Sequence, residues 1–508
     1  MTSEVRFQLP EPAFEQYTWV LADEHTPVAA PPLTADLFGP RGPQEGVPTS
    51  VRVNGYTYNR DGFPQMSARG APPESVEQMR LWRTEWLPEV DKVVDALSAF
   101  DPETVRPGEW AEVLEDQGRE YWRVFGAVHR LAVIPSYAAA QRFQEAYARR
   151  FGEARSGEAL ALLQGFPNAS LERAALLWEA GRVLHRHPDL LAALDGRRPL
   201  PETAAAAEFQ ERMRLVLERY GSTSEGFVED QPVWAEDPSL PLAAAHAFAR
   251  LPDGRGPLDS ARLQRERRER LEAALHAAAG DDEEAREVER LMRIAQEHLP
   301  NLEDHNYLCD QRLSAASRRR WLAIGRHLAA RGVIDAAEDV FYFYRAELVL
   351  ALEGETAPEK ALLQERRAQL ALWRSVSPPP VLGRPLPRRD GPLPPSLRAS
   401  EVRVLRGVAA SPGSYRGRAR VIDSIQEAAS LEAGDVLVCR ATTPAWTPFF
   451  ALIGALVANT GGLLSHSAVV AREFGIPAVI GAVTATVQVP DGATVTVDGT
   501  SGVVAIEG

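Results

Sequence analysis

The sequence predicts a multidomain protein with a mainly α-helical N-terminal body, a linker and a separate C-terminal domain. At 508 residues the chain is long enough for about two to four domains of ordinary size. Before residue 374, apolar residues recur at three- and four-residue steps, as in helices with one buried face. Eight prolines then fall within Ser377–Pro395, which can neither continue a helix nor enter a sheet interior. We therefore expect a body over 1–374, a hinge linker over 375–400 and a C-terminal domain over 401–508.

The first part of the body, 1–70, is expected to be irregular, because Glu11–Phe63 is rich in prolines and aromatic residues. Within it, the segment VRVNGYTYN (Val51–Asn59) places Asn54 and Gly55 between two short runs of strand-forming residues. Asn-Gly is a favoured pair for a two-residue turn with positive φ angles. This segment therefore predicts a short β-hairpin.

The rest of the body is predicted to be helical. One apolar face recurs from Glu74 to Phe100, although Pro88 should kink that helix or split it. Further stripes with charged solvent faces span Glu172–Leu194, Ala204–Tyr220, Leu258–Ala279, Glu283–Leu299 and Ser314–Arg331. The linker that follows should be a semi-rigid spacer of about 3 Å per residue, long enough to let a small domain move between sites. A passive surface connection is the alternative.

Composition limits the class of protein and its partners. The chain is 45% hydrophobic and 25% charged, as ordinary globular proteins are. Its net charge of −14 comes without a dominant basic patch, which argues against nucleic acid or an anionic membrane as the main partner. The sequence shows neither a membrane-spanning run nor a signal peptide, so we expect a cytoplasmic protein. With only Cys309 and Cys439, we expect no disulfide framework, and no histidine spacing suggests a metal site.

The most informative motif is TGGLLSH, which runs from Thr460 to His466. Gly461 and Gly462 allow turn conformations and a close approach to a ligand, and Ser465 is suited to cap the following helix. An imidazole at this position lies beside free backbone N–H groups and the positive end of a helix dipole. Such a place suits a side chain that carries a phosphoryl group, because the added charge of about −2 meets hydrogen-bond donors.

The pattern T-G-G-x-x-S-H-x-A-x-x-A-R-E-x-G-I-P-A-V resembles the phosphohistidine domain of the PEP-utilising enzymes. The likeness continues through three further segments, namely Gly407–Val421, Gly434–Phe450 and Thr494–Val504. It implies that the C-terminal domain is an α/β swivelling domain whose His466 takes a phosphoryl group from a nucleotide and passes it to an acceptor. Asn459 departs from the family, which often has Asp at this position.

Several segments of the body are similar to the acceptor-binding region of rifampicin phosphotransferase and the large subunit of phenylphosphate synthase. These segments are Tyr17–Thr34, Leu162–Ser170, Pro232–Pro238, Glu303–Arg312 and Glu338–Leu348. The resemblance implies a helical domain that holds a small organic hydroxyl compound, aromatic compounds included, for phosphorylation.

The sequence contains no segment that resembles the ATP-grasp domain of these enzymes, their PEP-binding barrel or a GxxxxGK[ST] loop. We therefore expect Mg-ATP to act through a separate ATP-grasp subunit. Two other interpretations stay open. One is a non-catalytic relative that lost its kinase module, and the other is a repurposed enzyme whose mobile domain clamps a substrate for different chemistry.

Further residues are candidates for the two half-sites. Thr460 and Ser465 are candidate hydroxyl donors to the phosphoryl oxygens, and Arg472 is a candidate partner for the same oxygens or for a docking surface. The alternatives without a catalytic role are a simple turn hydroxyl for Thr460 and a solvated side chain for Arg472. His305 is a candidate base for the acceptor hydroxyl, since Glu303, Asp304 and Asp310 flank it, or else a satisfied helix histidine.

The acceptor pocket is predicted from aromatic and charged residues. Expected to line it are Trp19, His25, Trp234, Asp310, Arg312, Phe341 and Tyr342. Aromatic residues at such spacing are also common in ordinary cores. Arg312 and Arg318–Arg320 form a basic cluster that would steer an anion inward, although an exposed helix face explains it equally well.

Overall fold

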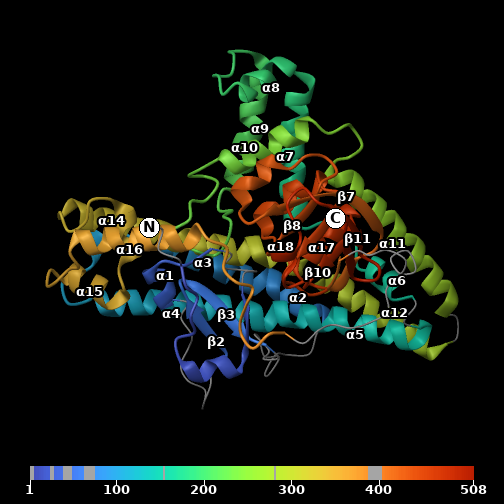
Figure 1. Cartoon of the computed structure of the whole chain (residues 1–508), viewed down its shortest axis with the longest axis horizontal. Coiled ribbons are helices and arrows are strands. Elements are labelled where there is room, and N and C mark those ends of the chain that lie inside the picture. Colours follow the sequence, from blue (N-terminus) through green and yellow to red (C-terminus); the bar gives the residue numbers. More distant parts are fainter. Residues whose placement is uncertain are drawn as a thin grey trace.

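The computed structural model describes residues 5–22, 28–37, 48–61, 75–152, 155–279, 282–386 and 403–507. The predicted fold class is confirmed, because a mainly helical body carries a C-terminal α/β domain (Figure 1). Figure 1 shows the C-terminal domain in red, set between α7 and α10 on one side and α11 on the other. Across these ranges, every helix is too short or too polar to span a bilayer.

The body starts with a small sheet in the order β2-β3-β1-β4. Its strands are β1 (Thr18–Leu21), β2 (Ser50–Val53), β3 (Tyr56–Arg60) and β4 (Val381–Gly383). The hairpin predicted at Asn54 and Gly55 is confirmed, since their φ angles are 52° and 76°. β4 comes from the segment predicted as a linker and pairs with β1 at the edge of the sheet. Prolines next to an edge strand are tolerated, because the missing N–H groups remove no hydrogen bond between inner strands. The last part of that segment, from residue 387 to its predicted end at residue 400, lies outside the described residues.

The helices of the body follow the predicted stripes closely. In chain order they are α1 (Pro32–Leu37), α2 (Val76–Leu81), α3 (Leu87–Ser98), α4 (Trp110–Val128), α5 (Ile134–Phe151), α6 (Ser156–Ala161), α7 (Ala169–Arg186), α8 (Pro188–Asp195), α9 (Ala204–Tyr220), α10 (Ser239–Ala249), α11 (Pro257–Ala279), α12 (Glu283–His298), α13 (Asn301–His305), α14 (Arg312–Ala330), α15 (Arg345–Glu353) and α16 (Lys360–Arg374). Short 3-10 turns connect them at η1 (Pro12–Gln16), η3 (Pro102–Thr104) and η7 (Ala337–Tyr342).

Three π-helical turns interrupt these helices, at η2 (Trp82–Trp86), η4 (His129–Val133) and η6 (Asn306–Gln311). The first explains how the helix around Pro88 continues. The π-turn η2 directly precedes α3, in which Pro88 is the second residue, and both prolines and π-turns are usual causes of a kink in a continuous helix. The predicted kink therefore takes the form of a π-turn.

The C-terminal domain is built on a mixed sheet in the order β5-β12-β11-β7-β8-β9-β10-β6. Its elements are β5 (Arg403–Arg406), β6 (Val408–Ser411), β7 (Ser414–Ile422), η9 (Ile425–Ser430), β8 (Val436–Cys439), η10 (Pro444–Ala451), β9 (Ala455–Ala458), α17 (His466–Phe474), β10 (Ala478–Ile480), α18 (Ala485–Gln488), β11 (Thr494–Asp498) and β12 (Val503–Ile506). The strands β7, β8, β9 and β10 pair in parallel. Their carboxyl ends lie at one edge, and the loops that follow β8 and β9 meet there.

The two domains share one apolar core. Leu177 of α7 and Phe248 of α10 belong to the same buried cluster as Trp446 and Phe449 of η10 and Val470 of α17. Burial of this shared surface favours the docked arrangement, because apolar area leaves water on both sides. The docked arrangement sets the position of His466 relative to the body.

We expect Gly325→Ala to destabilise the body, because a Cβ atom there would lie 2.0 Å from the carbonyl oxygen of Ala337. Such an overpacked helix contact should lower the free energy of unfolding by about 1–3 kcal/mol or more. Urea denaturation measures this change. Gly126→Ala in α4 is the matched control, since nothing lies within 4 Å of its added Cβ atom. If both variants unfolded at the urea concentration of the parent, this account of the α14 packing would be wrong.

Candidate active site between the body and the C-terminal domain

His466 is the first residue of α17 and follows the glycine turn after β9. Gly461 has a φ angle of 115°, and a Cβ atom there would lie 2.8 Å from Oγ of Ser465, so glycine is required. Ser465 takes the predicted N-cap position with an extended backbone, but its side chain makes no capping hydrogen bond. The turn therefore presents the imidazole at a helix N-terminus, as the motif predicts.

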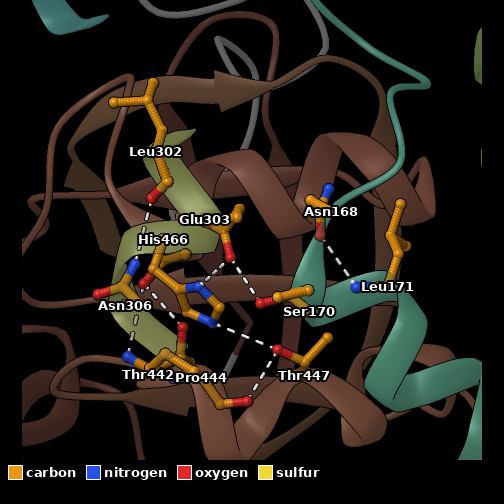
Figure 2. A network of polar contacts seen from close by, with 12 residues as sticks. Asn168, Ser170, Leu171, Leu302, Glu303, Asn306, Thr442, Pro444, Thr447 and His466 are labelled. Carbon is orange, nitrogen blue, oxygen red and sulfur yellow. Dashed lines mark hydrogen bonds and ion pairs between the residues drawn. The ribbon is translucent and has the colours of Figure 1, made fainter. Parts of the chain in front are cut away.

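The imidazole reaches out of its own domain to a carboxylate of the body. Nδ1 of His466 lies 2.8 Å from Oε2 of Glu303 on α13 (Figure 2). Ser170 at the start of α7 donates to the same oxygen at 2.7 Å. Glu303 is 2% exposed, and its other oxygen has no hydrogen-bond partner among the described residues. A carboxylate in this position accepts the proton of Nδ1, which leaves the lone pair on Nε2.

The opposite side of the ring faces a hydroxyl and a buried guanidinium. Nε2 of His466 lies 3.5 Å from Oγ1 of Thr447, which lies 3.4 Å from NH2 of Arg173. Arg173 also donates to the carbonyl of Pro444, and in the part of the chain that the structure describes its Nε and NH1 atoms have no hydrogen-bond partner. Burial lowers the pKa of Arg173 to about 10, so the side chain stays charged at neutral pH.

The surroundings of the ring are thus polar on both sides. The side chain of His466 is 9% exposed, and it lies between Glu303 and Thr447 instead of in an apolar pocket. The guanidinium carbon of Arg173 lies 5.7 Å from the ring centroid of Tyr220 and 5.6 Å from that of Trp234. The aromatic rings attract the guanidinium cation and help to hold it in place. Thr447 lies between this cation and the imidazole of His466.

The helix that carries His466 is anchored at several points. Ser467 lies 2.8 Å from the hydroxyl of Thr442 in the loop after β8. Arg472 is buried and donates to the carbonyl of Ala410 on β6 at 2.8 Å. Arg472 is therefore directed into its own domain, in contrast to the solvated or phosphoryl-facing arginine considered from the sequence. Thr460 likewise turns to a carbonyl, that of Arg440, at 3.2 Å.

Glu473, the residue after Arg472, crosses the domain boundary. Its two oxygens accept the backbone N–H of Gly165 in the body, at 3.1 Å and 3.0 Å. Burial raises the pKa of Glu473 to about 8, against the weaker opposing effect of the Gly165 N–H. The docked state therefore favours the protonated carboxyl.

The predicted acceptor residues do not gather in one place. Trp19, Phe341 and Tyr342 are buried in a core of the N-terminal sheet and α14, whereas Trp234 lies beside Arg173 in the core shared by the two domains. These side chains therefore line no common pocket. His25 lies outside the described residues.

The basic cluster is also not an exposed helix face. Arg318 and Arg320 are 6% and 3% exposed, and Arg318 pairs with Glu236 at 2.7 Å. Arg312 pairs with Asp91 at 2.7 Å. The structure thus places Arg312 and Arg318 in ion pairs within the body, away from His466.

His305 points away from His466 as well. Its Nδ1 atom lies 2.6 Å from the carbonyl of Asn301, and its Nε2 atom lies 4.0 Å from Oδ2 of Asp310. His305 and Asp310 form a buried group with His129, and the potential ligand atoms of these three side chains all lie within 4.8 Å of one another.

Sequence reasoning missed Ser170, Arg173 and Thr447 as site residues. The first two lie at or just after the end of the segment Leu162–Ser170, and Thr447 lies within Gly434–Phe450, which are both segments of the family resemblance. No periodicity distinguishes Arg173 from the solvated arginines of other helices, because the residues that surround it, such as Trp234 and Thr447, are distant in the sequence. The resemblance was the one available signal.

Two family descriptions match parts of the chain. Residues 431–502 match "PEP-utilising enzyme, mobile domain", and residues 129–302 match "Rifampicin phosphotransferase fourth domain". The first contains His466, and the second contains Ser170 and Arg173. The resemblance stated from the sequence motifs is confirmed by these matches.

Three curated proteins are similar in sequence to most of this chain. Chondramide synthase cmdD of Chondromyces crocatus is 30% identical over 84% of this chain and 12% of its own length. The uncharacterized phosphotransferase YvkC of Bacillus subtilis (strain 168) is 31% identical over 74% of this chain and 47% of its own length. A rifampicin phosphotransferase of a Streptomyces species is 30% identical over 77% of this chain and 46% of its own length. The chain spans less than half the length of these relatives.

We expect stability to fall as pH rises from about 4.5 through about 8, because Glu473 must lose a proton that its folded environment retains. Below that window the carboxyl is protonated in both states, and above it the full cost is present. Glu473→Gln should remove this dependence and stabilise the protein at pH 9 by up to roughly 5 kcal/mol, since a pKa raised from 4.5 to about 8 spans about 3.5 units of about 1.4 kcal/mol each. Unfolding curves at pH 5 and pH 9 measure the difference. A variant with the same pH dependence as the parent would contradict the assignment.

Proposed function

We propose that this chain, which carries the mobile domain of the PEP-utilising enzymes at residues 431–502, is a phosphotransferase component that shuttles a phosphoryl group on His466. The donor is Mg-ATP bound to a separate ATP-grasp partner, and the acceptor is a hydroxyl of a small organic compound held by the helical body. The observation that carries the proposal is the contact of His466 with Glu303 across the domain boundary. The named phosphotransferases among the relatives support the reaction type.

The geometry favours Nε2 of His466 as the atom that carries phosphorus. Nδ1 is engaged by Glu303, whereas Nε2 faces Thr447 and, beyond it, the guanidinium of Arg173. Hydroxyl and guanidinium groups are good donors to phosphoryl oxygens, and the buried cation offsets their charge. Phosphoryl transfer depends mainly on this kind of positioning and charge stabilisation.

In the first half-reaction, Nε2 attacks a phosphorus atom of the nucleotide at the partner. A P–N bond forms as the P–O bond to the leaving nucleotide breaks, and the ring keeps its Nδ1 proton. The domain then docks on the body in the arrangement of Figure 2, where the Nδ1–H group meets Glu303. The nearby carboxylate stabilises the positive charge of the phosphorylated ring.

In the second half-reaction, the acceptor oxygen attacks the same phosphorus atom in line. A P–O bond forms, the P–N bond breaks, and the electron pair returns to Nε2 of a neutral imidazole. The acceptor proton passes to water. Glu303 acts as a positioning residue in this step, because a ring held in its protonated, cationic form is a better leaving group.

The chain incubated with labelled ATP and an ATP-grasp partner should yield an acid-labile, base-stable phosphoprotein. His466→Ala should abolish the label, whereas the control His327→Ala should keep it, since His327 pairs with Glu103 on the surface of α14. Autoradiography after acid and base treatment measures the outcome. Equal labelling of the His466→Ala variant would rule out the proposal, and turnover of an acceptor without nucleotide would favour a repurposed enzyme.

Glu303→Gln should leave labelling intact but slow discharge of the phosphoprotein to hydroxyl acceptors. The reason is that a neutral amide at this position would no longer hold the proton on Nδ1, and a phosphorylated ring without that proton is a poorer leaving group. Loss of such a positioned proton costs about 10²-fold or more in rate. Quenched single-turnover discharge, with a panel of phenols and alcohols, measures the rate. Glu297→Gln is the matched control, because that carboxylate pairs with Arg83 on the surface. Discharge at the parent rate would show that Glu303 has no part in transfer.

A further inference from the structure

A second cluster of titratable side chains lies inside the body, and the proposed transfer makes no use of it. His129 begins the π-turn η4, His305 ends α13, and Asp310 lies in the π-turn η6. Their exposed fractions are 8%, 4% and 0%. A π-turn adds a residue to a helix at some cost in hydrogen-bond geometry, and such turns occur frequently at functional sites. Here two of them bring the cluster together.

Both imidazoles are oriented in the same way by the backbone. Nδ1 of His129 lies 2.8 Å from the carbonyl of Phe125, and Nδ1 of His305 lies 2.6 Å from the carbonyl of Asn301. A carbonyl only accepts, so each Nδ1 carries a proton, and each Nε2 faces the carboxylate and is the atom that can bind a metal ion when the ring is neutral. The two Nε2 atoms lie 3.5 Å and 4.0 Å from the same oxygen, Oδ2 of Asp310.

This arrangement is the one that metal-binding histidines adopt. A ligating imidazole donates its other N–H to a carbonyl or carboxylate, which fixes the tautomer and the ring orientation. Two imidazoles and one carboxylate form a ligand set for zinc and for other divalent transition metals, with positions left open for water or another ligand. The ligand atoms lie within 4.8 Å of one another, close enough for side-chain adjustments to bring them to one ion.

We propose that His129, His305 and Asp310 bind one divalent transition-metal ion. A metal ion at this place would put a cation beside the buried carboxylate of Asp310 while both histidines stay neutral. Spacing along the sequence could not reveal this site, because His129 lies on a different helix from the other two ligands.

The alternative is a metal-free cluster in which a protonated His129 pairs with Asp310. Substitution of the proposed ligands distinguishes the metal site from this ion pair. The full-length chain, stripped with EDTA and dialysed against Zn²⁺, should retain about one equivalent by elemental analysis. The Co²⁺-loaded chain should show visible d–d absorption. Asp310→Asn and His129→Gln should each weaken Zn²⁺ binding by at least about 100-fold, the loss seen for weaker, outer-shell changes.

His276→Gln is the matched control, since that histidine pairs with Glu289 on the surface, and it should bind Zn²⁺ as the parent does. Because Asp310→Asn alone could fail to fold, the melting temperature of the parent is a second measurement. It should rise on addition of Zn²⁺ and return with EDTA. Zn²⁺ retention that survives both ligand substitutions, or no retention and no shift in melting temperature in the parent, would overturn the proposal. Neither result depends on the phosphoryl-transfer role of His466.

Discussion

The contact between His466 and Glu303 is the constraint on which the site depends. It joins the first residue of α17 in one domain to α13 in the other, at 2.8 Å. A 2%-exposed carboxylate is costly to bury unless it is hydrogen-bonded, and Ser170 and His466 together satisfy one of its oxygens. The orientation of the imidazole therefore depends on docking, and each domain alone holds only half of the site.

The same boundary contains further buried polar groups. Arg173 of the body donates to Pro444 of the C-terminal domain, and Glu473 of that domain accepts from Gly165 of the body. Desolvation of such groups offsets part of the gain from the shared apolar core around Phe248 and Phe449. In the proposed shuttle the domain leaves one site for another, and this balance suits that movement, because a purely apolar interface of the same size would hold the domain more firmly.

Features with local causes could be predicted from the sequence. The hairpin at Asn54 and Gly55 and the helix Ala204–Tyr220 follow from turn chemistry and periodicity, and the turn that places His466 follows from its glycines. Contacts between distant segments could not be predicted. The partners of His466, and the burial of Arg318 and Arg320 on a helix that looks amphipathic, depend on how separate elements pack.

The segment formed by α13 and η6 connects the two polar clusters. Glu303 and His305 are two residues apart on one helix, so their side chains leave it on different faces. Glu303 faces the C-terminal domain, whereas His305 faces Asp310 and His129 within the body. Interactions that hold the cluster of His129, His305 and Asp310 in place therefore also hold the backbone that carries Glu303. A short helix followed by a π-turn has few hydrogen bonds of its own to hold it in place. The position of Glu303 relative to His466 therefore depends on the cluster of His129, His305 and Asp310 as well as on docking of the two domains.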